Sequence, residues 1–134
     1  MEQAAMRFFQ KDPGIRPLYE KLESRMRSEI ADVMVSVQPT QISFARDHTF
    51  ACVSFARLGR AEDSRKSRMV LTFKLNKRIS SPRVQVFPSP HLNRWTHHTA
   101  VSSPGEIDAE LLGWLKESSS FAEEKPSDGG FFPA

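Results

Sequence analysis

Hydrophobic residues follow helical spacing over residues 15–30 of the chain. Apolar side chains recur there three or four positions apart, which places them on one face of a helix, while charged side chains occupy the other face. The apolar face is made by Ile15, Leu18, Tyr19, Leu22, Met26 and Ile30. The pattern predicts an amphipathic helix that packs this face against a core.

A second helical pattern lies between Ile107 and Phe121. Its apolar side is made by Ile107, Leu111, Leu112, Trp114 and Leu115. Just before it, Ser103 can act as the N-cap, Pro104 suits the first helical position, and Glu106 completes a capping box. These residues predict a helix that begins directly after Ser103 and fades near Phe121.

Between the two helices the hydrophobic period changes to two, which is typical of half-buried strands. The runs that predict strands are Val33–Val37, Gln41–Ala45, Thr49–Leu58, Met69–Leu75, Val84–Phe87 and His97–Val101. The polar segment 46–48 predicts a hairpin between the second and third runs. In the fourth run, Thr72 and Lys74 share the face opposite the apolar residues, and we expect that face to contact water.

The N-terminal segment, residues 1–14, carries a weaker signal. A short helical turn is expected around Met6, Phe8 and Phe9, because Asp12-Pro13-Gly14 is a strong break in regular structure. We expect this segment to precede the main domain, which the pattern places at residues 15–121.

Two polar segments are predicted to lie outside regular structure. The stretch Gly59–Arg68 has no apolar face, so it is expected to project as a mobile loop between two strands. Residues 122–134 combine Pro, Gly and charge, and they are expected to form a flexible C-terminal tail.

The order of these elements predicts an α+β fold. A helix, a series of strands and a closing helix fit a two-layer domain with a mainly antiparallel sheet of about four to six strands. Long βα alternation is missing from the pattern, which argues against a doubly wound parallel sheet. The predicted core comprises Leu18, Leu22, Val35, Phe44, Leu71, Phe73, Leu111 and Leu115.

Composition supports a globular class and a cytoplasmic location. The 134 residues are 39% hydrophobic and 26% charged, which suits one domain with its own core. No apolar run is long enough for a membrane-spanning helix, and the N-terminus lacks the apolar stretch of a secretion signal. Cys52 is the only cysteine, so no disulfide can form within the chain, and a reducing cytoplasm is expected.

Positive charge is concentrated in residues 57–83, which hold nine Lys or Arg residues against Glu62 and Asp63. Clustered cations can bind the phosphate backbone of a nucleic acid by releasing counterions. The candidate contacts are Arg60, Arg65, Lys66 and Arg68. The alternative is that these charges only solvate a loop and the neighbouring strand faces.

The segment 94–98 combines an aromatic ring, a permanent cation and two imidazoles, and it is the candidate ligand-binding site. Its residues are Arg94, Trp95, His97 and His98. Trp and Arg are enriched in binding hot spots, and such a group could stack a base or hold an anion. If the segment is extended, the two histidines face opposite ways. The alternative is that Trp95 only closes the end of the sheet.

Catalytic, cofactor and metal motifs are missing from the sequence. There is no GxSxG elbow and no phosphate-binding glycine loop, and Cys52 lies in an apolar run typical of a buried thiol. The four histidines show no zinc-ligand spacing, so we expect neither a metal nor a cofactor.

The sequence resembles a known family at several places. The segment PLYEKL in the first helix, the strand pairs QISFARDHTFACVSFAR and RMVLTFKLN, and a Trp-centred turn before the last strand and helix are similar to the bacterial domain-of-unknown-function family 5655. The resemblance covers about Ile15 to Phe121. It implies a small α+β fold with an antiparallel sheet and implies no established activity. Many members carry a Gly-His-Trp-Gly-like turn, whereas Trp95 here lies between Arg94 and Thr96.

These observations favour a non-enzymatic interaction or ligand-binding module, with a protein or small molecule as its partner and no membrane association. The alternative is a nucleic-acid-associated domain that uses the basic region 57–83. A small hydrolase or transferase ranks third.

Overall fold

The computed structural model describes residues 2–10, 13–55, 69–88 and 94–124. Its helices are α1 (Glu2–Phe9), α2 (Arg16–Glu29) and α3 (Ala109–Glu124), and its strands are β1 (Met34–Val37), β2 (Ile42–Ala45), β3 (Thr49–Ser54), β4 (Met69–Leu75), β5 (Gln85–Pro88) and β6 (Trp95–Val101). Short 3-10 turns at Pro13–Ile15 and Pro104–Glu106 precede α2 and α3.

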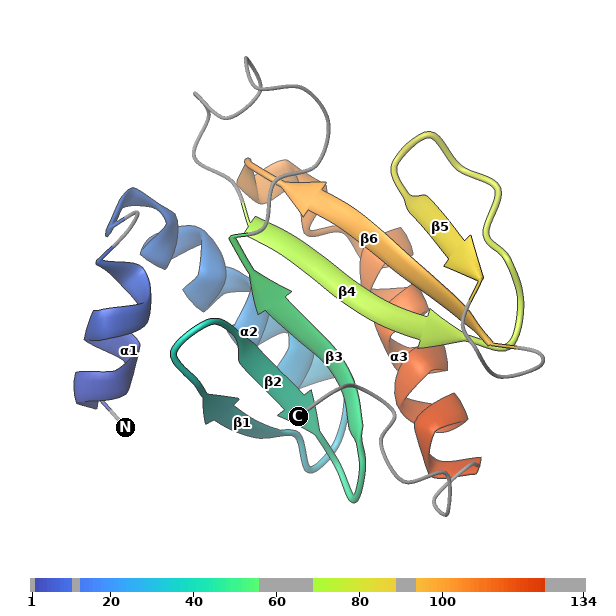
Figure 1. Ribbon diagram of the computed structural model, residues 1–134, viewed down its shortest axis with the longest axis horizontal. Helices are drawn as coiled ribbons and strands as arrows, with labels where there is room; N and C mark the ends of the chain where they lie inside the picture. Colours follow the sequence, from blue (N-terminus) through green and yellow to red (C-terminus); the bar gives the residue numbers. More distant parts are fainter. Residues whose placement is uncertain (1, 11–12, 56–68, 89–93, 125–134) are drawn as a thin grey trace.

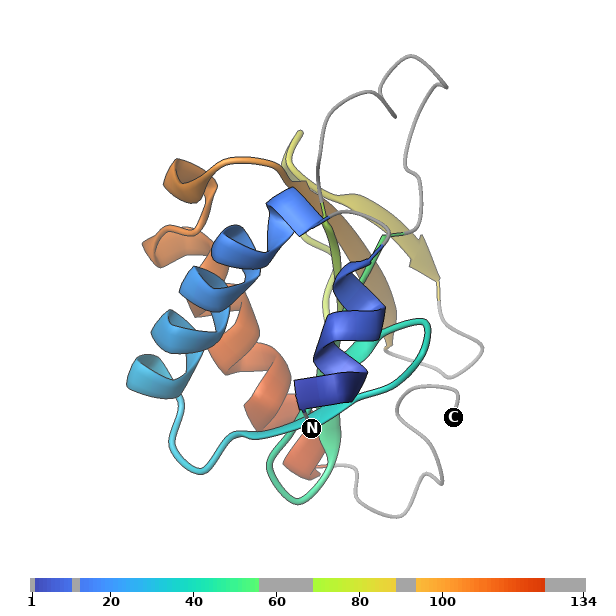
Figure 2. The same ribbon diagram turned by 90° about the vertical axis from the view of Figure 1, so that its left-hand side faces the viewer.

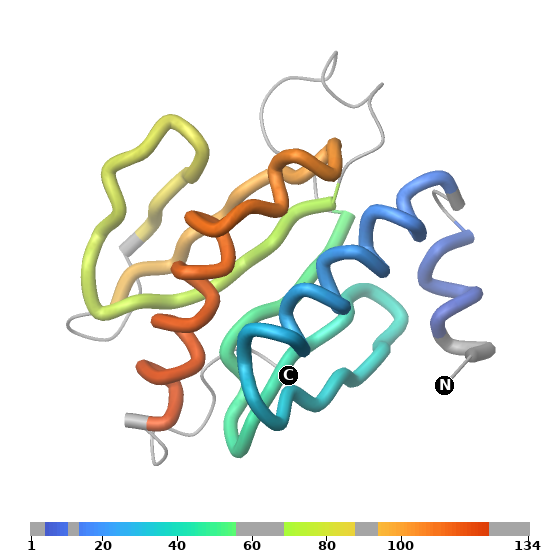
Figure 3. The backbone as a smooth tube through the Cα atoms, turned by 180° about the vertical axis from the view of Figure 1, so that it is seen from behind, coloured from blue at the N-terminus to red at the C-terminus, as the bar shows by residue number. Residues whose placement is uncertain are grey.

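Within the described residues, the six strands form one antiparallel sheet in the order β1-β2-β3-β4-β6-β5 (Figure 1). Helices α2 and α3 lie side by side on one face of this sheet, and α1 lies beside β1 (Figures 2 and 3). The predicted α+β class with an antiparallel sheet and helices near both ends is therefore confirmed.

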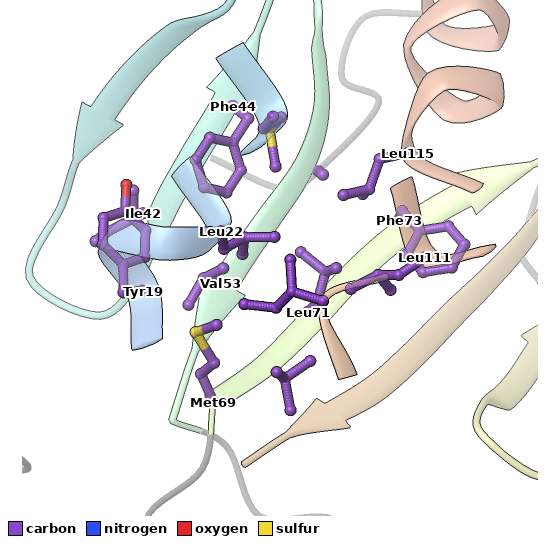
Figure 4. Packing of buried hydrophobic residues seen from close by; sticks show 14 of the residues in the cluster. Tyr19, Leu22, Ile42, Phe44, Val53, Met69, Leu71, Phe73, Leu111 and Leu115 are labelled. Carbon is purple, nitrogen blue, oxygen red and sulfur yellow. The ribbon is translucent and has the colours of Figure 1, made fainter. Parts of the chain in front are cut away.

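The core lies between the sheet and the two long helices (Figure 4). The apolar face predicted for residues 15–30 is buried throughout, as is the apolar side of α3. Seven of the eight predicted core residues are buried, and Val35 is half-buried because β1 is the edge strand of the sheet. Large apolar side chains that leave water in this way provide most of the driving force for folding.

The six predicted strands correspond to β1 to β6, with differences in their bounds. The third was predicted to extend to Leu58, but β3 ends at Ser54, and residues 56–58 lie outside the described ranges. The hairpin predicted at residues 46–48 joins β2 to β3, and the Arg46 amide donates to the His48 carbonyl at 3.3 Å. The last strand begins at Trp95, two residues before the predicted start at His97. It lies between β4 and β5, so the edge strand β5 joins the sheet only through β6.

The prediction that the second face of β4 contacts water is wrong for most of that strand. Val70 and Thr72 are buried and Lys74 is half-buried. β4 is a central strand, and Thr72 lies in register between Cys52 and His98 of its two neighbours. A central strand has a neighbour on each side, so its side chains are less accessible to water than those of an edge strand.

The predicted start of the last helix also needs a correction. Ser103 and Glu106 form the expected capping box, but it caps the 3-10 turn Pro104–Glu106, and α3 begins only at Ala109. Asp108 supports that second start, because its carboxylate accepts from the Leu111 amide at 3.0 Å. At its other end α3 continues to Glu124, beyond the predicted end near Phe121.

The N-terminal segment is more ordered than a single turn. α1 is eight residues long, and Phe8 and Phe9 are buried in the core cluster. The ring of Phe8 stacks on Phe55 at 4.7 Å between centroids, and Phe9 contacts Tyr19 at 5.3 Å. These aromatic contacts attach α1 to the body of the protein. The predicted mobile loop at 59–68 and the tail from residue 125 onward lie outside the described residues.

Candidate functional site

A cleft of about 450 Å³ opens between α1, α2 and the β1–β2 hairpin. Its floor is apolar and is made by Ala5, Phe9, Val35, Val37 and Ile42. The strand residues reach it because alternation directs the odd-numbered side chains of β1 toward the helices. Phe9 reaches it from the last turn of α1, next to the buried Tyr19 ring.

The rim of the cleft is polar and belongs to α2. The Tyr19 hydroxyl donates to a Glu23 carboxylate oxygen at 2.8 Å, and Arg27 Nε donates to the other oxygen at 3.0 Å. A second guanidinium nitrogen, Arg27 Nη1, donates to the Val33 carbonyl at 3.0 Å. The three side chains lie four positions apart along the helix, so they meet on one face. Glu23 is thus held between two donors.

A second charged pair extends the rim toward α1. Arg16 Nε donates to Glu20 at 3.3 Å, and its guanidinium carbon lies 5.5 Å from the centroid of the Phe9 ring. This arrangement places a cation over the aromatic part of the floor. The cleft therefore has an apolar floor and a rim that carries both guanidinium and carboxylate groups.

Burial raises the pKa of Tyr19, and its hydrogen bond to Glu23 acts in the same direction. The phenol therefore stays protonated at neutral pH and acts as a hydrogen-bond donor, not as an ionised nucleophile. The cleft can bind a molecule through this chemistry, but it does not assemble a nucleophile with a general base.

The two histidines of the predicted ligand site face opposite sides of the sheet, as strand alternation requires. His97 is fully buried on the helix side, where its ring stacks on Phe73 with 5.2 Å between centroids. His97 Nε2 accepts from the Ile79 amide at 3.1 Å, so Nδ1 carries the proton and donates to the Trp95 carbonyl, also at 3.1 Å. The prediction that the inward imidazole finds a hydrogen-bond partner is confirmed.

His98 lies on the other face and is half-buried. Its Nδ1 shares a hydrogen bond of 2.9 Å with the Thr72 hydroxyl, and its ring meets Phe87 at 5.6 Å in an edge-on contact. Burial lowers the pKa of both imidazoles, and the positive charge of a protonated His98 would lower that of His97 further. Both rings are therefore neutral at pH 7.

The structure does not gather Arg94, Trp95 and the histidines around one surface. Arg94 is buried, with an exposed fraction of 3%. Trp95 is half-buried, and the cation that lies over its ring, at 5.9 Å, is Arg78. The indole that packs against the core belongs instead to Trp114, which stacks on Phe73. Whether the segment binds a ligand stays a prediction.

The predicted polyanion contacts are four cations of the loop between β3 and β4. They lie outside the described residues, so this role stays a prediction: Arg60, Arg65, Lys66 and Arg68.

In the described part of the chain, no three His, Cys, Asp or Glu side chains come together as a metal site. Cys52 is buried, and burial raises the pKa of its thiol to about 11.

No helix within the described ranges combines the length and apolar character needed to cross a membrane.

Sequence reasoning did not identify the cleft. The helical pattern places Tyr19 on the apolar face of its helix, and Glu23 and Arg27 belong to the polar side of the same pattern. The four-residue spacing of these side chains was a signal for their contacts. The cleft also needs α1 and β1 beside the helix, and this placement depends on long-range packing.

Arg83 joins the β4–β5 connection to the start of α3. Its guanidinium donates to Asp108 at 3.1 Å, to Glu110 at 2.8 Å and to the Glu106 carbonyl at 2.7 Å. The same group lies 5.5 Å from the centroid of the Trp114 ring. Arg83 thereby links the β4–β5 connection to the first residues of α3 and to the ring of Trp114.

Arg83→Met is expected to lower the free energy of unfolding by about 1–2 kcal/mol, because it removes charge-assisted hydrogen bonds from a side chain that is mostly shielded from water. Urea denaturation followed by circular dichroism measures the change. The matched control is Lys77→Met, which removes a more exposed ion pair with Glu117 and should cost less than about 0.5 kcal/mol. Equal effects of the two substitutions would contradict the role given to Arg83.

The chain matches a family model. A family model described as Domain of unknown function (DUF5655) matches residues 7–122, which is most of the chain. No curated protein gives a significant match, and no solved structure does so either. The matched range includes most of the residues that form the cleft and the whole of the sheet.

Proposed function

We propose that the chain, which belongs to the DUF5655 family, is a non-enzymatic ligand-binding module. The observation that carries this proposal is the cleft between α1, α2 and the β1–β2 hairpin, with its apolar floor and its hydrogen-bonded polar rim. Small-molecule sites commonly have this composition: mostly apolar surface with a few fixed polar groups.

The size of the cleft supports a small molecule as the ligand. A volume of about 450 Å³ lies within the range of roughly 300–1,000 Å³ that is usual for ligand pockets. The apolar floor would contribute affinity by removing hydrocarbon or aromatic surface from water. We therefore infer an amphipathic ligand whose apolar body lies against Val35, Val37 and Ile42.

The rim would orient the polar end of that ligand. Arg27 and Glu23 are held in place by their hydrogen bonds to each other, to Tyr19 and to the Val33 carbonyl. A site whose polar groups are already ordered loses little further conformational entropy on binding. The protonated state of Tyr19 supports a binding role over a catalytic one, since it leaves this phenol without a charge for nucleophilic attack.

The proposal can be tested with anilinonaphthalene sulfonate, a fluorescent probe that has an aromatic body and an anionic end. The native protein is expected to enhance the probe's fluorescence with saturable, single-site binding. Val37→Glu should weaken this binding about tenfold or more, because a carboxylate replaces apolar surface on the floor and repels the anionic end of the probe.

Val86→Glu is the matched control. Val86 is also a half-buried valine on an edge strand and also pairs in register on the helix side, but it lies at the opposite edge of the sheet. This variant should bind the probe as the native protein does. Thermal melts of all three proteins show whether each is folded. Equal binding by native protein and Val37→Glu, with both folded, would contradict the proposal.

The proposal includes a bacterial origin and a cytoplasmic location. The buried free thiol of Cys52 is compatible with a reducing compartment. The nucleic-acid alternative through residues 57–83 remains a separate proposal, and its loop residues lie outside the described part of the chain.

A further inference from the structure

We propose that a pocket at the β4–β5 connection binds a small phosphomonoester, with Arg78, Ser80 and Ser81 as its phosphate contacts. The pocket has a volume of about 380 Å³, and its walls are this connection and Val86 of β5. Figure 1 shows the connection curving beside β5, at the edge of the sheet opposite β1. The site is therefore separate from the cleft of the proposed function, which adjoins β1.

Arg78 supplies positive charge to this pocket. The sequence contains no Asp or Glu from Ser64 to Gly105, so no acidic residue lies near it along the chain. The other two cations of the connection, Lys77 and Arg83, form ion pairs with carboxylates of α3. Arg78 forms no ion pair with any residue that the structure describes. Its charge is therefore available to an anionic ligand.

The ring of Trp95 supports the Arg78 guanidinium without using its hydrogen-bond donors. Arg78 is exposed, and its guanidinium carbon lies 5.9 Å from the centroid of that ring. A guanidinium over an aromatic ring interacts through its face, which leaves the N–H groups at its edge for a ligand. Two of these N–H groups can bind two oxygens of one phosphate.

Two serine hydroxyls add donors to the same wall. The Ser81 hydroxyl oxygen accepts from the Arg83 amide at 3.2 Å, so the hydroxyl keeps its hydrogen for donation to a ligand. Ser80 is exposed, and its hydroxyl is within reach of a molecule in the pocket. The guanidinium and the hydroxyls together form a set of donors from one short segment.

The connection that carries these donors is fixed to the sheet. Near its start, the Ile79 amide donates to His97 Nε2 at 3.1 Å. Near its end, the Thr99 hydroxyl donates to the Arg83 carbonyl at 2.8 Å. Both bonds lead to β6. A wall that is already held in this way loses little conformational entropy when a ligand binds.

A phosphomonoester fits the lining better than other anions do. It carries a charge of about −1.5 to −2 at pH 7 and three terminal oxygens that accept hydrogen bonds. The remainder of the lining is apolar and can contact a small organic body: Ile79, Pro82, Val84 and Val86. The volume lies within the range of roughly 300–1,000 Å³ that is usual for small-molecule sites, so an esterified phosphate fills it better than a free ion.

The test is isothermal titration calorimetry of the native protein with phenyl phosphate, at about pH 7.5 and constant ionic strength. We expect binding at one site and displacement by excess inorganic phosphate. Benzoate should bind about tenfold or more weakly, because it has the same ring but a smaller charge and fewer acceptor oxygens.

Arg78→Gln should weaken the binding of phenyl phosphate about tenfold or more, because it removes the guanidinium contact. Lys77→Gln is the matched control. It removes the neighbouring cation, which pairs with Glu117 and does not line the pocket, so the affinity should stay unchanged. Thermal melts show that each variant is folded.

Two further variants separate this site from the cleft. Val86→Glu places a carboxylate in the pocket wall, so it should weaken the binding of phenyl phosphate and leave that of anilinonaphthalene sulfonate unchanged. Val37→Glu should do the reverse, because Val37 belongs to the cleft floor. The proposal is overturned if phenyl phosphate does not bind, if folded Arg78→Gln binds it like the native protein, if Lys77→Gln has the same effect as Arg78→Gln, or if Val37→Glu weakens its binding and Val86→Glu does not.

Discussion

Replacing Phe73 with alanine is expected to lower the free energy of unfolding by roughly 3–5 kcal/mol. Phe73 is fully buried in the central strand β4, where its ring stacks on those of His97 and of Trp114 in α3. Alanine would leave a large cavity between sheet and helix, and the fixed strands around it cannot close that space. Urea denaturation followed by circular dichroism measures the loss.

Phe87→Ala is the control for this experiment. It makes the same change in side chain on a neighbouring part of the sheet, but Phe87 is about half exposed and lies on the opposite face. Its cost should be about 1 kcal/mol or less. A loss from Phe73→Ala as small as that from Phe87→Ala would show that the core is not organised around this ring.

A second large effect is expected from His97→Ala, with a loss of roughly 1–3 kcal/mol or more at about pH 7.5. The substitution leaves the Ile79 amide and the Trp95 carbonyl without their imidazole partner, and it also opens space beside Phe73. His98→Ala should cost less, because His98 is half-buried and makes one hydrogen bond to a side chain. Equal losses from the two variants would contradict the assignment of one inward and one outward imidazole.

The same two histidines predict how stability depends on pH. Burial lowers the pKa of each in the folded protein below its ordinary value of 6.5. In the unfolded chain both rings take up protons as the pH falls through about 6.5, whereas in the folded protein they do so only at lower pH. The unfolded state then binds more protons, so stability is full above about pH 6.5 and is lost as the pH falls toward the folded-state values.

Urea melts at about pH 7.5 and about pH 5.5 measure this dependence. The native protein should lose stability between the two values, and His97→Ala should lose less over the same interval because one of the shifted groups is gone. A native protein whose stability rises as the pH falls to about 5.5 would contradict the lowered pKa values.

The spacing of hydrophobic residues along the chain predicts which side chains face the core and which face away from it. The buried face of α2 follows from helical spacing, and the opposite orientations of His97 and His98 follow from strand alternation. That orientation does not depend on the strand boundary, so the start of β6 at Trp95 left it unchanged. The capping box at Ser103 formed as expected, but the same box can stabilise a 3-10 turn, and a second cap at Asp108 decides where α3 begins.

The candidate cleft could not be predicted in this way, because it depends on contacts between distant segments. Its floor requires Phe9 of α1 to lie beside Val37 of β1, and neither residue carries a local signal for the other. The position of β6 between β4 and β5 is also a long-range choice. Arg83 similarly appears in the sequence as one cation of a basic region, whereas in the structure it binds the carboxylates at the start of α3.

The most direct test of the ligand-binding proposal is a nuclear magnetic resonance titration of isotope-labelled protein with anilinonaphthalene sulfonate. The proposal predicts that amide shifts change mainly in α1, along α2 and in β1, and that β5 changes little. Shifts centred on β5 and β6, or a general loss of dispersed signals on adding the probe, would contradict a site in the cleft.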